Sequence, residues 1–268
     1  MENFQLLSFH KSLKDQYHKL DRGVGAILPY YIYDNELRLQ IKLPEGTTSL
    51  NLSLIRADGT GDVSTQAFTI QTYEDRNYDI GLLSWNLHDN FPHGDYYVFF
   101  DYPGTADTWY SDLIRIVKLD KGLLRIRYRH HKDLELPTHH LDFTEGQGTT
   151  FEYVVYLKST SQTSDILGKP QYFFEEVVTR RRGYNYYQQL ISGKRYLFET
   201  MVSEPVMDGL RLLKLFSDIH IRESGRPEKK VHDVYMNVSW ESWGYAAFPT
   251  IEFDTDTVVV SNTKARHL

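Results

Sequence analysis

The sequence predicts a mainly β protein with two β-sandwich or barrel-like domains, the second carrying one packed α-helix at about residues 204–216. Three observations predict this class. Short runs in which apolar and polar residues alternate, the pattern of half-buried strands, recur along most of the chain. Gly, Asp and Pro residues with strong turn chemistry separate these runs. Aromatic residues make up 14% of the 268 residues, with 20 Tyr and 14 Phe, and such residues favour strands.

The first domain is predicted over residues 35–118, after an N-terminal arm at residues 1–34. The arm ends in a short apolar run in which Pro29 restricts any strand to a sheet edge, because proline cannot donate a backbone hydrogen bond. The clearest strand covers 36–43, where leucine or isoleucine occupies every second position. Runs of the same kind follow near 49–57, 66–75, 79–87, 94–101 and 109–117. Short strands separated by tight turns are typical of an antiparallel β-sandwich.

The second domain is predicted over residues 119–268. Its first strand, near 123–129, alternates three apolar residues with three arginines. Later runs lie near 149–158, 170–183, 194–202, 217–223, 229–242 and 246–256. One segment has helical spacing instead, with Pro205 suited to a first turn and an apolar stripe that includes Leu210 and Leu213. These residues predict a helix packed on the second sheet.

Composition excludes several classes of function. The chain has no Cys, so it has no disulfide, no thiolate metal ligand and no Cys nucleophile. The N-terminal residues lack the charged and apolar regions of a signal peptide, and no apolar stretch is long enough to span a bilayer. A protein that stays in a cytoplasm, without membrane contact, is therefore expected. The net charge of −6 disfavours a nucleic-acid partner.

Two histidine pairs, His130–His131 and His139–His140, lie near Asp142 and offer the ligand types that zinc prefers. Adjacent residues of a strand point to opposite faces, so each pair could give only one ligand to a site. The sequence also lacks HExxH and His-x-His spacing. We interpret the segment between His130 and His140 as solvated loop residues, and predict neither a metal nor a cofactor.

Paired carboxylates at Glu175–Glu176 and Asp254–Asp256 raise the alternative of a glycoside-active enzyme, which needs two carboxylates about 5–10 Å apart across one sugar. A chain with 36 acidic residues contains many such pairs by chance, and solvated strand faces explain them equally well. The sequence contains no GxSxG elbow, no P-loop and no GxGxxG. We predict no catalytic residue and a protein that is not an enzyme.

The segment "TRRRGYNYYQQ", residues 179–189, interleaves arginines with tyrosines in a predicted hairpin loop. Such a mixture can bind single-stranded nucleic acid, can bind another protein, or can form a polar tip without a partner. The acidic chain favours the protein partner over nucleic acid. Arg181, Arg182, Tyr184 and Tyr186 are the predicted contact residues.

A second aromatic segment contains Trp240, Trp243 and Tyr245. These side chains could stack on sugar rings, so a carbohydrate- or receptor-binding β-sandwich module remains an alternative. They could equally close a sandwich core or lie at a subunit interface.

The order of features along residues 36–257 resembles a known group. The segments that carry the resemblance are "GDYYVFFD", "TWYSDLIRI", "LRIRYRH", "KPQYFFEEVVTRRRG", "SGKRYLFETMVSEPVMDGLRLLKLFSDIHIRE" and "WGYAAFPTIEFDTD". Together they resemble virion structural proteins of the tail and neck rings of Bacteroidetes tailed phages, crAss-like phages included. The His-rich segment 130–140 departs from this group.

The resemblance implies a non-enzymatic bacteriophage subunit that has no catalytic residues to transfer. It implies a homo-oligomer ring with head-to-tail contacts, and further contacts to other tail or neck proteins. It also implies localisation in the virion after assembly in the cytoplasm of a bacterial host, which agrees with the absence of Cys and of a signal peptide.

Overall fold

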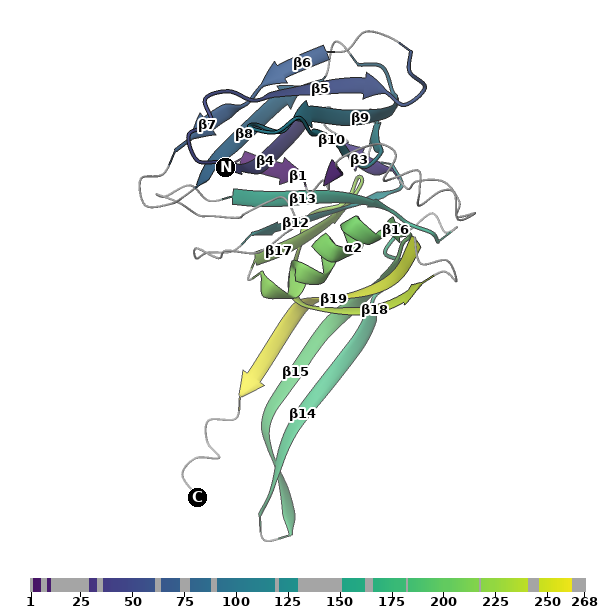
Figure 1. Cartoon of the computed structure of the whole chain (residues 1–268). Coiled ribbons are helices and arrows are strands. Elements are labelled where there is room, and N and C mark those ends of the chain that lie inside the picture. The colour runs from purple at the N-terminus through teal and green to yellow at the C-terminus, as the bar shows by residue number, and fades with distance from the viewer. Residues whose placement is uncertain are drawn as a thin grey trace.

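The structure is a computed structural model of the chain. It describes residues 2–5, 9–10, 29–32, 36–60, 64–72, 78–87, 91–118, 121–129, 151–161, 166–181, 183–216, 218–240 and 246–261. This part is mainly β, as predicted, with three sheets and one α-helix. Figure 1 shows a β-sandwich at one end, a large curled sheet around the helix in the middle, and a long hairpin that projects from the other end.

Two sheets form the sandwich. The seven-stranded sheet contains β2 (Phe9–His10), β10 (Thr108–Ser111), β9 (Gly94–Asp101), β11 (Ile114–Ile116), β3 (Tyr30–Ile32), β5 (Asn51–Arg56) and β6 (Ser64–Ala67). The three-stranded sheet contains β4 (Glu36–Pro44), β8 (Tyr78–Asn86) and β7 (Thr69–Gln71). In β4, Leu37 and Leu39 are fully buried, as the alternation along the strand predicts.

Two runs expected to be single strands are divided. The run near 66–75 passes from one sheet to the other at Phe68, whose side chain is buried between them. The run near 109–117 breaks after β10, where Ser111 Oγ accepts a hydrogen bond from Val98 N at 3.0 Å and donates one to Asp112 O at 2.7 Å. The Ser111 hydroxyl thus replaces a backbone partner at the gap in the ladder.

The N-terminal segment contributes strands to both halves of the molecule. β1 (Glu2–Gln5) runs parallel to β13 (Phe151–Lys158) in the large sheet, and β2 pairs antiparallel with β10 in the sandwich. β3 pairs parallel with β11 and lies at the end of its sheet, which is the edge position expected from Pro29.

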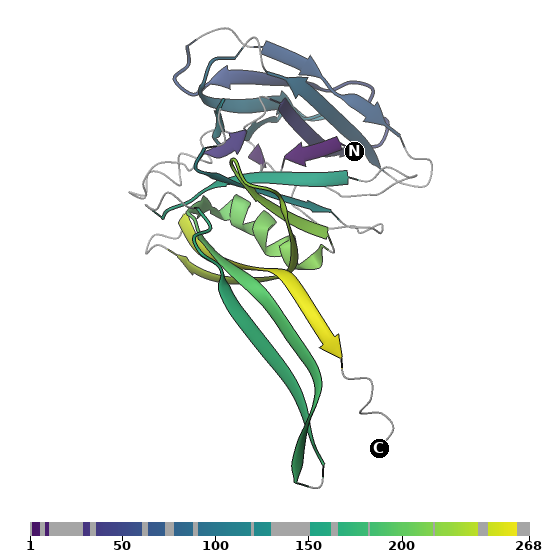
Figure 2. The same ribbon diagram turned by 180° about the vertical axis from the view of Figure 1, so that it is seen from behind.

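The large sheet has nine strands in the order β1-β13-β12-β17-β18-β19-β15-β14, with β16 paired to β19. Their bounds are β12 (Leu123–Arg129), β13 (Phe151–Lys158), β14 (Gln171–Arg181), β15 (Tyr184–Glu199), β16 (Val202–Ser203), β17 (Asp218–Glu223), β18 (Lys229–Trp240) and β19 (Ala246–Ser261). Figures 1 and 2 show that the sheet curls around the helix, with β12 and β17 on one side of it and β18 and β19 on the other.

The helical segment consists of α2 (Glu204–Leu210) followed directly by a 3₁₀ turn, η1 (Arg211–Leu215). Leu210 and Leu213 are buried, which confirms the predicted apolar stripe. The Phe216 ring, just after η1, packs edge-on against Tyr128 with 4.7 Å between ring centroids. Burial raises the pKa of the Tyr128 hydroxyl, because no solvent stabilises its charged form.

Most buried apolar side chains of the sandwich and of the large sheet form one continuous cluster, and Leu123, Val154 and Tyr156 form a second, smaller one. Tyr30 joins the two halves, since its hydroxyl donates a hydrogen bond of 2.8 Å to Val154 O. Within the described residues, no helix is long and apolar enough to cross a membrane.

Candidate functional site

The projecting hairpin is formed by β14 and β15, and the end of β19 lies alongside β15. Both views show these strands continuing well past the curled part of the sheet (Figures 1 and 2). The turn contains Gly183 with a φ of 84°, a left-handed conformation that glycine adopts without steric strain. Most of segment 179–189, expected to be a loop, is therefore strand.

The predicted contact residues lie at the tip of this hairpin. Arg181 pairs with Tyr184 across the two strands, and Tyr186 pairs with Thr179 two positions further in. Arg182 lies outside the described residues. The structure thus places Arg181, Tyr184 and Tyr186 together at the end of the molecule furthest from the sandwich.

An exposed apolar face, which sequence reasoning missed, lies on the same hairpin. Phe174, Ser192 and Val258 occupy opposing positions on the three strands, and so do Glu176, Leu190 and Val260. Residues directly opposite each other share a face of a sheet. The apolar members of this face, called here the hairpin face, and their exposed fractions are Tyr172 at 66%, Phe174 at 67%, Val178 at 41%, Leu190 at 37%, Val258 at 59% and Val260 at 57%.

The hairpin face is the continuation of the side of the sheet that faces the core. Along β15, every second residue from Leu190 leads through Lys194 to Tyr196 and Phe198, which are buried in the core. The same side of the sheet is therefore covered near the helix and uncovered beyond it. Contiguous apolar surface of this kind marks contact with another molecule in soluble proteins.

The base of the hairpin is shaped by a β-bulge between Ser192 and Lys194. Opposite Gly193, the ring of Phe173 approaches within 2.7 Å of where a Cβ would be, so any larger residue there would force the ring to shift. On β19, Asp256 has a φ of 51°, and its carboxylate accepts a hydrogen bond of 3.0 Å from the Lys194 ammonium. The ion pair with Asp256 raises the pKa of Lys194.

Arg195 further stiffens this base. It binds the buried Asp254 through two hydrogen bonds of 2.7 and 2.8 Å. Its guanidinium also lies 5.1 Å from the centroid of the Phe173 ring and 4.6 Å from that of Tyr235. The hydrogen bonds that Arg195 donates to Asp254 hold the pKa of Arg195 above its ordinary value. The base of the hairpin is thus held by an ion pair whose guanidinium also lies over two aromatic rings.

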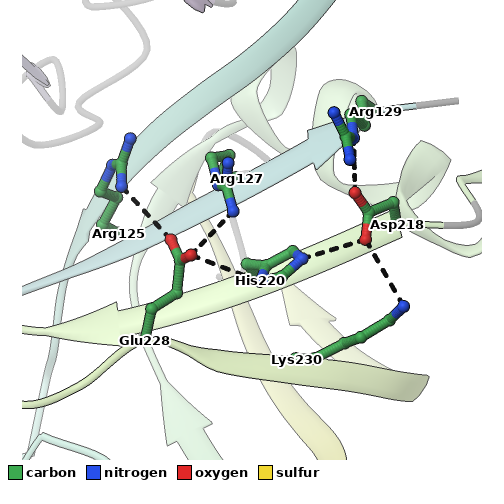
Figure 3. Close-up of polar contacts among 7 residues, drawn as sticks. All are labelled: Arg125, Arg127, Arg129, Asp218, His220, Glu228 and Lys230. Carbon is green, nitrogen blue, oxygen red and sulfur yellow. Dashed lines mark hydrogen bonds and ion pairs between the residues drawn. The ribbon is translucent and has the colours of Figure 1, made fainter.

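A cluster of charged residues lies on the opposite face of the large sheet from α2 (Figure 3). Arg125, Arg127 and Arg129 alternate along β12 with the buried apolar residues that face the helix. Glu228 lies between the first two, 3.4 Å from Arg125 and 2.7 Å from Arg127. Its carboxylate also lies 3.4 Å from His220 Nδ1.

The second carboxylate of this cluster belongs to Asp218, which is buried. Arg129 donates a hydrogen bond to it, His220 Nε2 lies 3.0 Å away and Lys230 Nζ 3.8 Å away. Burial raises the pKa of Asp218, but the hydrogen bonds from Arg129 and His220 outweigh burial and hold that pKa below its ordinary value. Because basic groups surround both carboxylates, the cluster holds β12, β17 and the start of β18 together.

The carboxylate pairs weighed for a glycosidase do not face a common site. Glu175 and Glu176 are exposed and adjacent on β14, so they point to opposite faces of the hairpin. Asp254 is bound by Arg195, and Asp256 by Lys194.

Other candidates from the sequence fall partly outside the structure. Trp240 is 48% exposed at the end of β18, whereas Trp243 and Tyr245 lie outside the described residues. The histidines from 130 to 140 also lie outside them. A small cavity between Tyr31, Tyr156 and Met201 has a volume of about 20 Å³, which is room for roughly one water molecule.

No family model matches the chain, and no curated protein matches its sequence.

Proposed function

We propose that the chain is a non-enzymatic structural subunit of a phage virion, a tail or neck ring component that packs against copies of itself and against other virion proteins. The observation that carries the proposal is the projecting hairpin with its uncovered apolar face. The resemblance of the sequence to ring proteins of Bacteroidetes phages supplies the virion context.

The chemistry of the hairpin suits a protein partner. Tyr172 and Phe174 each leave about two thirds of their surface in solvent, and burial of such a side chain stabilises a complex by about 1.5–3 kcal/mol. The tip adds arginine and tyrosine, the residue types that dominate binding energy at protein interfaces. The ion pairs of Lys194 and Arg195 at the base of the hairpin hold this face in one orientation, so it can bind a neighbouring subunit in a fixed geometry.

Purified virions provide the test. Mass spectrometry of intact particles is expected to detect the chain, and imaging is expected to place it in a ring of the tail or neck. Particles that lack the chain, or turnover of a glycan by the purified protein, would overturn the proposal.

A matched pair of variants tests whether the hairpin face makes the contact. Phe174→Ser removes an exposed apolar side chain from the hairpin and is expected to lower incorporation into particles without changing the melting temperature. Leu215→Ser is the control, because Leu215 is also exposed, at 51%, but lies on η1. Equal incorporation of both variants would mean that the hairpin face is not the contact.

A further inference from the structure

The outer edge of β14 is available for strand pairing. β14 is the last strand of the large sheet and pairs with β15 on one side only; no strand among the described residues pairs with its other side. The edge is 11 residues long. In both views β14 lies on the outer side of the hairpin, away from β19 (Figures 1 and 2). An exposed edge of this length is a template for another strand.

Two devices that normally block such an edge, a proline and a bulge on the strand itself, are missing from β14. The strand contains no Pro and no Gly. A bulge interrupts its ladder with β15 between Val177 and Val178, but the extra residue, Gln188, lies on β15. The backbone of β14 therefore presents an unbroken row of hydrogen-bonding groups to a partner.

The charges along the strand are antisymmetric about Val178. The run 175–181 reads "EEVVTRR". Each glutamate on one side of Val178 therefore has an arginine at the same distance on the other side. Glu176 and Arg180 lie two positions from it, and Glu175 and Arg181 lie three positions from it.

We propose that two copies of this chain pair through the β14 edge, antiparallel and about a two-fold axis at Val178. In this register Glu176 of one copy lies opposite Arg180 of the other, and Glu175 lies opposite Arg181. The two-fold axis makes each pairing twice, which gives four Glu–Arg pairs across the new ladder. Opposite charges directly across an antiparallel ladder attract, and like charges there repel.

The same charges oppose two other ways in which this edge could pair. A parallel, in-register arrangement puts each glutamate beside a glutamate and each arginine beside an arginine. An antiparallel arrangement centred on Glu176 puts that residue opposite itself. Among the two-fold arrangements centred on a residue of the run 175–181, only the one at Val178 gives four Glu–Arg pairs. The charges of β14 therefore favour this register, in which the partner is a second copy of the chain. The contact is isologous, so it is additional to any head-to-tail contact within a ring.

This inference goes beyond the proposed function, and its test uses only the purified full-length chain and no virion. A failure of the dimer can therefore be distinguished from a failure of the proposed function. The first test is charge reversal, read by sedimentation over a range of protein concentrations. Wild type is expected to dimerise. Glu175→Arg with Glu176→Arg, and separately Arg180→Glu with Arg181→Glu, are each expected to weaken the dimer at least tenfold. An equimolar mixture of the two variants is expected to form a heterodimer, because the opposite charges again face each other.

Controls separate loss of pairing from loss of folding. Circular dichroism and thermal melts of each variant are expected to match wild type, and reversal of the exposed Glu45 in the sandwich is expected to leave the dimer unchanged. A wild type that remains monomeric at its highest soluble concentration overturns the proposal. So does a dimer that is insensitive to both reversals, or a mixture in which no heterodimer forms.

A cross-link gives a second, independent test. The chain has no Cys, so Val178→Cys creates a single thiol at the proposed axis. Residues opposite each other in an antiparallel ladder have Cα atoms about 4.5–5.5 Å apart, within the range that a disulfide bridges. Mild oxidation is expected to give a covalent dimer of this variant and not of Val259→Cys, an exposed site on β19. Equal cross-linking of the two variants contradicts the proposed register.

Discussion

Truncation of Leu213 tests whether the curled sheet depends on the helix that it surrounds. Leu213 lies in η1 with none of its surface exposed, inside the continuous core cluster. Leu213→Ala removes three carbon atoms from a site enclosed on all sides, so it loses both the burial of those atoms and the contacts around the resulting cavity. Substitutions of this kind lower the free energy of unfolding by about 2–5 kcal/mol.

Thermal melts followed by circular dichroism measure this loss. In a chain of this size each kcal/mol shifts the melting temperature by about 2–4 °C, so a loss near the middle of the range lowers it by about 7–14 °C. Leu215→Ala is the matched control from the same turn, because Leu215 is 51% exposed. Its expected change in free energy is within about 0.5 kcal/mol. Equal shifts for the two variants would refute the assignment of Leu213 to the core.

Three further substitutions test other parts of the structure. Gly193→Ala is expected to destabilise the fold by about 1–3 kcal/mol, because its Cβ would meet the Phe173 ring; an unchanged melting temperature would contradict this packing. Asp218→Asn is expected to reduce the loss of stability on acidification. The lowered pKa of Asp218 stabilises the wild type above about pH 3.8, and that contribution disappears as the pH falls further. Urea unfolding at pH 7 and pH 3 measures the difference, and equal losses in both proteins would refute the role given to Asp218. Ser111→Ala is expected to lower the free energy of unfolding by about 1–3 kcal/mol, since Val98 N loses its acceptor, and urea unfolding measures this as well; a change near zero would contradict it.

Most of the fold could be predicted because its signals are local. Alternation within β4 follows from which side chains face the core, and the spacing of Leu210 and Leu213 follows from the helical period. The break at Ser111 could not be predicted, because a hydroxyl that substitutes for a backbone partner leaves no periodic pattern. The conversion of the last helical turn to 3₁₀ form was likewise not visible in the apolar spacing.

The candidate site also contains features that the sequence predicts and features that it does not. The arginines and tyrosines of 179–189 are recognisable from composition alone. The hairpin face is not, because Tyr196 and Val258 are both apolar strand residues, and only the position of the helix decides which one is buried. Only part of the charged cluster could be predicted. The arginines that alternate along β12 are visible in the sequence, but their partner Glu228 is 103 residues from Arg125 along the chain. Pairing over such a distance depends on the tertiary fold.

The hairpin offers two surfaces that differ in chemistry. The β14 edge offers backbone hydrogen bonds and an ordered row of charges, which specify register and partner. The hairpin face offers apolar area, which supplies affinity but little direction. An uncovered apolar face next to a free edge would promote indiscriminate association, and the charges at 175–176 and 180–181 favour the one antiparallel register proposed for that edge. The edge can therefore select a second copy of the chain while the face remains available to a different neighbour. This division agrees with a subunit that contacts both its own kind and other proteins in one assembly.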